Sequence, residues 1–165
     1  ACLFIKKEAF ESLGGFDEQY FAHQEEIDLC WRAQNKGYNI KYIGTSTVYH
    51  LGGATLNQMN PKKTFLNFRN SLFSITKNLP LTKAVPILFI RMLLDGIAGV
   101  RFLTQLKFGH FLAIIRSHFS FYWYLPAMYR KRENANSTLN YYRTKSIVWS
   151  YFVKQKKKFN ILVKD

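Results

Sequence analysis

The chain has 165 residues, of which 48% are hydrophobic and 17% aromatic, and its formal net charge is +14. This apolar content can form a packed core, so it excludes an intrinsically disordered tail. Two cysteines, Cys2 and Cys30, allow at most one disulfide, which excludes a disulfide-stabilised scaffold. A basic, aromatic-rich composition is typical of proteins that bind nucleic acid or an anionic membrane surface.

The charge is distributed unevenly along the chain. Residues 1–50 contain five basic and seven acidic side chains, whereas residues 51–165 contain nineteen basic and three acidic ones. This change in composition predicts a boundary between two segments of different function, near residues 52–61.

Two short helices are predicted in the acidic segment. Residues 6–13 have the pattern of one or two helical turns, and Gly14 and Gly15 supply the positive φ angles that end a helix. Residues 24–35 alternate apolar and charged side chains at helical spacing. Gly37 suits the position just after the C-terminus of that helix.

Three strands are predicted in the same segment. Residues 2–5 form an apolar run, residues 38–43 alternate apolar and polar side chains, and residues 46–50 form another short run. Because the chain begins inside the first of these strands and without methionine, we expect it to be a piece of a longer protein. Strands and helices together predict an α/β fold.

The basic segment predicts longer helices at residues 64–77, 85–106 and 108–128. None offers about 18–20 uninterrupted apolar residues, so none is predicted to cross a membrane. Basic amphipathic helices rich in Phe, Trp and Tyr are typical of proteins that lie in a membrane interface. A cluster of lysines at residues 154–158 adds a feature attracted to anionic lipid.

Two oppositely charged pairs are spaced four residues apart within the predicted helices. Asp28 and Arg32 are predicted to form an intrahelical salt bridge that orients its helix. Arg91 and Asp95 are predicted to pair on one face of the helix at residues 85–106.

Three carboxylates, Glu25, Glu26 and Asp28, lie within four residues. Like charges this close raise one another's pKa and are unfavourable unless a cation or a substrate occupies the site, which is typical of functional sites. The alternative is a solvated acidic first turn, favoured by the helix dipole.

Five ordered segments carry a resemblance to a known family. They are Gly14-Gly15-Phe16-Asp17-Glu18, Tyr20-Phe21, Glu25-Glu26-Ile27-Asp28-Leu29-Cys30-Trp31-Arg32, Gly37-Tyr38 and Val48-Tyr49-His50. Their order and spacing resemble the C-terminal half of the catalytic domain of family 2 glycosyltransferases, which have the GT-A fold. The resemblance covers roughly residues 1–80, through Asn67-Phe68-Arg69-Asn70. It implies a partial, Rossmann-like GT-A domain at residues 1–80, followed by a basic, membrane-associated helical extension at residues 81–165.

The resemblance also implies a reaction. A sugar would pass with inversion from a nucleotide-sugar donor to a glycan or lipid-linked acceptor. The second acid of the family's acidic pair removes the proton from the acceptor hydroxyl, and here that position is Glu26. Glu replaces the commoner Asp, so the assignment is open between Glu25 and Glu26, and Glu26 is favoured.

A divalent metal, Mn or Mg, is implied at the donor diphosphate. The resemblance assigns His50 to this metal, although a structural histidine is the alternative. Most of the ligands would come from an upstream Asp-x-Asp motif that this chain lacks, so we expect the chain to lack the donor-binding half. The Gln-x-x-Arg-Trp motif of processive synthases is also absent, which favours a non-processive enzyme.

Further site residues have two interpretations each. Asp17 and Glu18 are predicted near the acceptor, with a turn-capping Asp as the alternative for Asp17. Arg69 and Asn70 are predicted to contact donor phosphate, with a helix-surface role as the alternative.

Two other functions compete with the glycosyltransferase. A basic nucleic-acid-binding module would account for the charge, but the aromatic residues here lie among Leu and Ile. A zinc site at Cys2, Cys30, His23 and His50 has no ligand pair at zinc-finger spacing and is set aside. The expected location is the cytoplasmic face of the cell membrane, held peripherally by an anionic surface.

Overall fold

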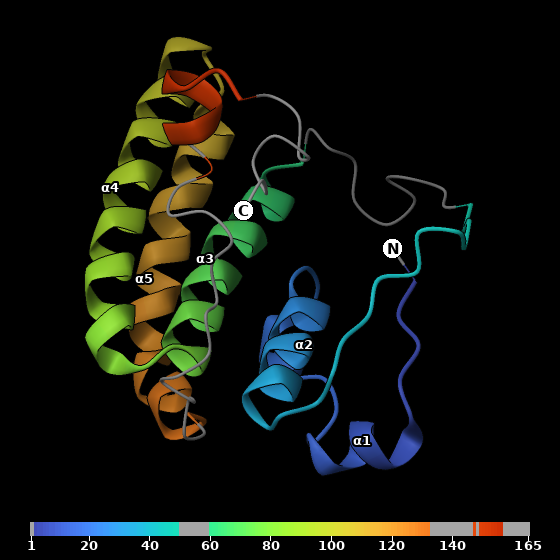
Figure 1. The fold of residues 1–165 in the computed structure, drawn as a ribbon. Helices are drawn as coiled ribbons and strands as arrows, with labels where there is room; N and C mark the ends of the chain where they lie inside the picture. Colours follow the sequence, from blue (N-terminus) through green and yellow to red (C-terminus); the bar gives the residue numbers. More distant parts are fainter. Residues whose placement is uncertain (1, 50–59, 133–146, 148, 157–165) are drawn as a thin grey trace.

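The computed structural model describes residues 2–49, 60–132, 147 and 149–156, and Figure 1 shows their arrangement. The elements are, in chain order, α1 (Lys7–Ser12), a 3-10 turn η1 (Glu18–Tyr20), α2 (Glu25–Asn35), α3 (Pro61–Asn78), α4 (Leu81–Thr104), α5 (Phe108–Arg130) and a π-helical turn η2 (Trp149–Val153). Helix α3 lies between α2 on one side and the α4–α5 pair on the other.

The prediction of an α/β, partial GT-A (Rossmann-like) fold is wrong for the part of the chain that the structure describes, which is helical and contains no strand. Residues 2–5, 38–43 and 46–49 have no regular structure, and His50 lies outside the described residues. A strand is stable only when its backbone groups pair with a neighbouring strand, and an apolar pattern supplies no partner. The side chains of Phe4 and Tyr42 are 86% and 94% exposed and take no part in the core, although the Tyr38 hydroxyl lies 3.0 Å from Ser12 Oγ of α1.

The helices predicted from periodicity are confirmed to within a few residues. The turns predicted at glycine are confirmed too, since Gly14, Gly15 and Gly37 have φ angles of 74°, 68° and 85°. Side chains rarely tolerate this left-handed region, so glycine can end α1 and α2 at little steric cost.

Local sequence also explains where α3 begins and ends. The side chain of Asn60 accepts a hydrogen bond from the backbone N–H of Lys62 at 2.9 Å, and Pro61 occupies the first helical turn. Both are favourable at a helix N-terminus. Leu79 leaves the helix with φ −95° and ψ 147° because it precedes Pro80, which disfavours helical backbone at that position.

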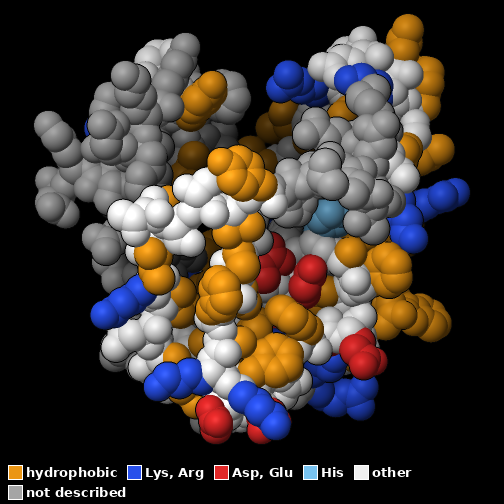
Figure 2. Space-filling view, turned by 90° about the vertical axis from the view of Figure 1, so that its right-hand side faces the viewer, with side chains coloured by type: hydrophobic (Ala, Val, Ile, Leu, Met, Phe, Trp, Pro, Cys, Tyr) orange, Lys and Arg blue, Asp and Glu red, His pale blue; other side chains and the backbone are white. Residues whose placement is uncertain are grey.

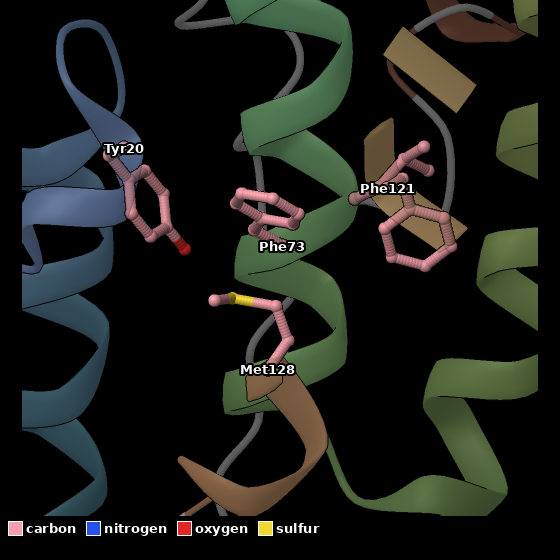
Figure 3. Packing of buried hydrophobic residues seen from close by; sticks show 5 residues of the cluster. Tyr20, Phe73, Phe121 and Met128 are labelled. Atoms are coloured by element: carbon pink, nitrogen blue, oxygen red, sulfur yellow. The ribbon is translucent and has the colours of Figure 1, made fainter. Parts of the chain in front are cut away.

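The main core joins α3, α5 and the loop around η1 (Figure 3). Its fully buried side chains are Tyr20, Leu72, Phe73, Phe121 and Met128. The ring of Phe73 lies edge-on to that of Tyr20, with centroids 5.8 Å apart, and 6.3 Å from that of Phe121. Phe73 of α3 therefore connects η1 to α5. A smaller cluster of Leu13, Leu29 and Ala33 packs α2 against the turn after α1.

The domain boundary predicted at residue 80 coincides with the turn between α3 and α4. The division into two domains stays a prediction, although the core contains residues from both sides of it. Within the described ranges, no helix combines the length and the apolar content needed to span a membrane.

Candidate functional site

The loop between η1 and α2 has an unusual backbone. Phe21, His23 and Gln24 have φ angles of 63°, 68° and 69°, and none of them is glycine. Side chains with a β-carbon disfavour this left-handed region. Such conformations persist only where surrounding contacts enforce them, and they cluster at functional sites.

Asn70 of α3 holds this loop in place. Its side-chain amide Nδ2 donates to the backbone carbonyls of Tyr20, Ala22 and His23 at 3.0, 2.9 and 2.7 Å. Asn70 is fully buried, and its contact with the Tyr20 carbonyl is buried while those with Ala22 and His23 are partly so. One side chain therefore ties together three carbonyls of the loop, of which that of Tyr20 also accepts from the backbone N–H of Ala22 at 2.7 Å.

Arg69 supports the same loop from the neighbouring position. Its Nη2 donates to the carbonyls of Gln19 and Tyr20 at 2.9 and 3.2 Å, and its Nε donates to Asn70 Oδ1 at 3.0 Å. Burial lowers the pKa of the guanidinium. Arg69 and Asn70 are buried, so the alternative of a helix-surface role is wrong. A donor-phosphate contact stays a prediction.

The loop delivers the chain to α2, whose first turn carries the acidic cluster. Gln24 donates from Nε2 to the carbonyl of Asn67 at 3.0 Å, which ties the start of α2 to α3. Glu26 is exposed, whereas Glu25 is half-buried and its Oε2 has no hydrogen-bond partner among the described residues. Figure 2 views this side of the molecule, where acidic side chains lie near the middle of the face among apolar ones.

The third carboxylate of the cluster, Asp28, has a different environment. It is fully buried, and its oxygens accept from four side chains. The donors are Tyr20 Oη (3.2 Å) and Asn78 Nδ2 (2.9 Å) at Oδ1, and Arg32 Nε (2.9 Å) and Lys77 Nζ (2.9 Å) at Oδ2. The predicted Asp28–Arg32 salt bridge is thus confirmed. Asp28 is a structural group, since its hydrogen-bonding capacity is fully used.

Asp17 joins the same ion network. Its Oδ2 accepts from Lys77 Nζ and its Oδ1 from Lys131 Nζ, each at 2.7 Å, and Oδ1 also accepts from the backbone N–H of Gln19. The alternative role of Asp17, capping of the turn, is therefore confirmed. Burial by itself would raise the pKa of Asp17, but the hydrogen bonds from Lys131 and Lys77, with the charge of Lys77, lower it to about 2.

A cavity of about 560 Å³ opens beside this network. Glu18 and Asp17 line it together with Lys77, Lys131 and the backbone turn that follows α1. The structure therefore brings the two predicted acceptor residues to one cavity. Glu25 and Glu26 do not line it. Contact of Asp17 or Glu18 with an acceptor stays a prediction.

Unpartnered buried polar atoms gather around the loop before α2. Gln19 Oε1, His23 Nε2 and Glu25 Oε2 have no hydrogen-bond partner in the described part of the chain. Buried polar atoms without partners are uncommon in proteins and call for an explanation. A ligand bound at the N-terminus of α2 is one explanation.

The described residues include no group of three or more His, Cys, Asp or Glu side chains that could hold a metal ion. The Mn or Mg site stays a prediction, because most of its ligands are expected from an upstream motif. His50, the predicted metal ligand of this chain, lies outside the described residues. Cys30 is a free thiol, and burial together with the nearby Glu26 carboxylate raises its pKa.

The sequence interpretation missed the role of α3. Arg69, Asn70, Lys77 and Asn78 all face inward, although each has a polar or charged side chain. Asn70 and Lys77 follow the buried Leu66 by four and eleven residues, which places them on the same face of the helix as this leucine. This pattern is visible in the sequence. Polar residues on the apolar face of a predicted helix indicate that the helix contacts buried polar groups of its neighbours.

Comparison with known proteins gives partial similarities. Over 50 residues the chain is 38% identical to N-acetylglucosaminyl-diphospho-decaprenol L-rhamnosyltransferase of Mycobacterium tuberculosis, and this match covers 30% of the chain. Over 111 residues it is 25% identical to the low-salt glycan biosynthesis hexosyltransferase Agl10 of Haloferax volcanii, and this match covers 65% of the chain. Its distant homologues are glycosyltransferases.

The matches are short relative to those proteins. They span 16% of the length of the rhamnosyltransferase and 36% of the length of the hexosyltransferase. No family model matches the chain, and no solved structure matches it significantly.

Proposed function

We propose that this chain contributes the proton-accepting part of the active site of an inverting, non-processive glycosyltransferase of family 2. A glycosyl group would pass from a nucleotide-sugar donor to a glycan or lipid-linked acceptor. The distant homologues support the general role, since their names describe a rhamnosyl transfer to a lipid-linked sugar and a hexosyl transfer in glycan synthesis.

The observation that carries the proposal is the difference in environment between Asp28 and Glu26 within the acidic cluster. Asp28 is buried and fully hydrogen-bonded, so it is not available to a substrate. Glu26 is exposed on the first turn of the same helix, directly after a backbone held in left-handed geometry. A carboxylate in that position can accept a proton from a bound hydroxyl group.

The chemical step that we assign to Glu26 is a single displacement. The acceptor hydroxyl gives its proton to the Glu26 carboxylate while its oxygen forms a bond to the anomeric carbon of the donor. The bond between that carbon and the diphosphate oxygen breaks, and the electron pair leaves with the nucleoside diphosphate. Attack from the opposite side inverts the anomeric configuration.

Position matters for this step, because misplacement of a catalytic group by about 1 Å can cost on the order of a hundredfold in rate. Asn70 and Arg69 therefore act as positioning residues in this proposal, since their hydrogen bonds fix the loop that precedes Glu25 and Glu26. The predicted divalent metal at His50 stays a prediction, and no step assigned here depends on it.

The test compares three substitutions in the intact protein as the cell makes it. Transfer is measured from an L-rhamnosyl and several hexosyl nucleotide donors to polyprenyl diphosphate-linked sugars. We expect Glu26→Gln to lower kcat by about 10²–10⁴-fold, with nucleotide-sugar binding retained. Glu25→Gln should have a smaller effect. Glu11→Gln, an exposed acid on α1, is the matched control and should transfer normally.

Two outcomes would contradict the assignment. Normal transfer by Glu26→Gln would exclude it as the base. A larger loss with Glu25→Gln, in a protein of unchanged stability, would move the role to Glu25. The circular dichroism spectrum and melting temperature of each variant separate these outcomes from a folding defect.

A further inference from the structure

Helix α4 exposes a long apolar stripe. Val85, Phe89, Leu93 and Ile97 follow one another at intervals of four residues, and each side chain is more than half exposed. Four-residue spacing places them on one face of the helix. Among the exposed positions of α4, Arg101 is the one charged side chain.

Helix α5 exposes a similar stripe with more aromatic residues. Leu112, Phe119, Tyr122 and Trp123 lie at helical spacing, and Trp123 is 82% exposed. The two stripes adjoin, because the Tyr122 hydroxyl donates to Met92 Sδ of α4 at 3.3 Å. Figure 1 shows α4 and α5 side by side, with α3 between this pair and α2. We call this exposed surface the α4–α5 face.

The charge around this face has one sign. Residues 60–132 contain twelve Lys and Arg but a single acid, Asp95. Asp95 is 2% exposed and lies between Arg91 Nε at 2.8 Å and His118 Nε2 at 3.0 Å, which confirms the predicted Arg91–Asp95 pair. No carboxylate is therefore exposed within residues 60–132. Arg101, Arg116 and Arg130 remain exposed on the two helices.

We propose that the α4–α5 face docks onto an anionic lipid bilayer, with both helices lying in the plane of the interface. Aliphatic side chains enter the region between headgroups and acyl chains, Trp123 and Tyr122 occupy the headgroup level, and the arginines contact acidic lipid. Charge complementarity favours this partner over a second copy of the chain, because two such faces would bring like charges together.

Nucleic acid fits this face less well. A nucleic-acid surface combines cations with aromatic rings that stack on bases, whereas Val85, Leu93 and Ile97 offer neither hydrogen bonds nor stacking. The proposal does not depend on Glu26, so lipid binding and glycosyl transfer can fail separately.

The test is flotation of the chain with phosphatidylcholine vesicles, with and without about 30% phosphatidylglycerol. We expect the chain to float with the anionic vesicles and to bind neutral ones at least about tenfold more weakly. The double variant Phe89→Asp/Trp123→Asp should lose binding at least about tenfold. Tyr42→Asp, which changes an exposed aromatic residue in the irregular segment after α2, is the matched control and should bind as the parent does.

Three results would overturn the proposal. The first is absence of binding to anionic vesicles by the parent chain. The second is unchanged binding by the double variant, with the fold checked by circular dichroism. The third is that the face serves another partner. In that case the parent would form a dimer in sedimentation velocity or bind oligo-uridine in a salt-sensitive way, and the double variant would lose this property but still bind vesicles.

Discussion

The Nζ of Lys77 lies 2.9 Å from Oδ2 of Asp28, which joins α3 to α2 through a buried ion pair. The side chain of Lys77 is 3% exposed and that of Asp28 is fully buried. Lys77 also binds Asp17, 60 residues earlier in the chain, at 2.7 Å. A single cation thus connects the turn before η1, the helix of the acidic cluster and α3.

The first prediction concerns this cation. Lys77→Met keeps the length of the side chain but removes the positive charge shared by the buried carboxylates of Asp17 and Asp28. We therefore expect the free energy of unfolding to fall by about 3 kcal/mol. Urea denaturation measures it. Lys7→Met, which removes an exposed pair with Glu11, is the control and should change stability by less than about 0.5 kcal/mol. Equal effects of the two variants would contradict the structural role of Lys77.

The second prediction concerns the loop before α2. Asn70→Ala removes the donors to three backbone carbonyls. We therefore expect the free energy of unfolding to fall by about 2–3 kcal/mol and hydrogen exchange at residues 21–26 to become faster. Asn67→Ala on the same helix keeps the backbone carbonyl that Gln24 uses and should leave exchange unchanged. If residues 21–26 exchange equally fast in the parent and in Asn70→Ala, Asn70 does not hold the loop.

The third prediction is a dependence of stability on pH. The pKa of Asp17 is about 2 in the folded state, against an ordinary value of 3.8, so its charged form is favoured by folding. Its contribution of about 2 kcal/mol is present above pH 4 and is lost as the pH falls toward 2. Asp17→Asn should therefore be less stable than the parent at pH 7, and the difference should disappear near pH 2. A difference that is constant from pH 7 to pH 2 would show that charge is not the cause.

The fourth prediction concerns the core. Phe73 is fully buried between Tyr20 and Phe121, so Phe73→Ala should lower the free energy of unfolding by about 3–5 kcal/mol. Thermal denaturation measures the loss. Phe119→Ala removes a ring that is 73% exposed and should have little effect. Similar losses for both variants would contradict the packing seen in Figure 3.

The sequence by itself determined the helices and the contacts within them. Periodicity located α2, α3, α4 and α5, and a spacing of four residues identified the Asp28–Arg32 and Arg91–Asp95 pairs. These features depend on neighbours within one or two helical turns, which a single sequence displays directly. The position of the acidic cluster in the first turn of α2 was predictable for the same reason.

Tertiary structure alone decided which carboxylate is buried and how the loop before it is shaped. Asp28 differs from Glu26 because Lys77 and Asn78, about 50 residues later, contact Asp28. The left-handed backbone at Phe21 and His23 opposes the preference of those residues and depends on Asn70. The predicted strands failed because strand pairing is also nonlocal: an alternating pattern shows the faces of a strand but not its partner.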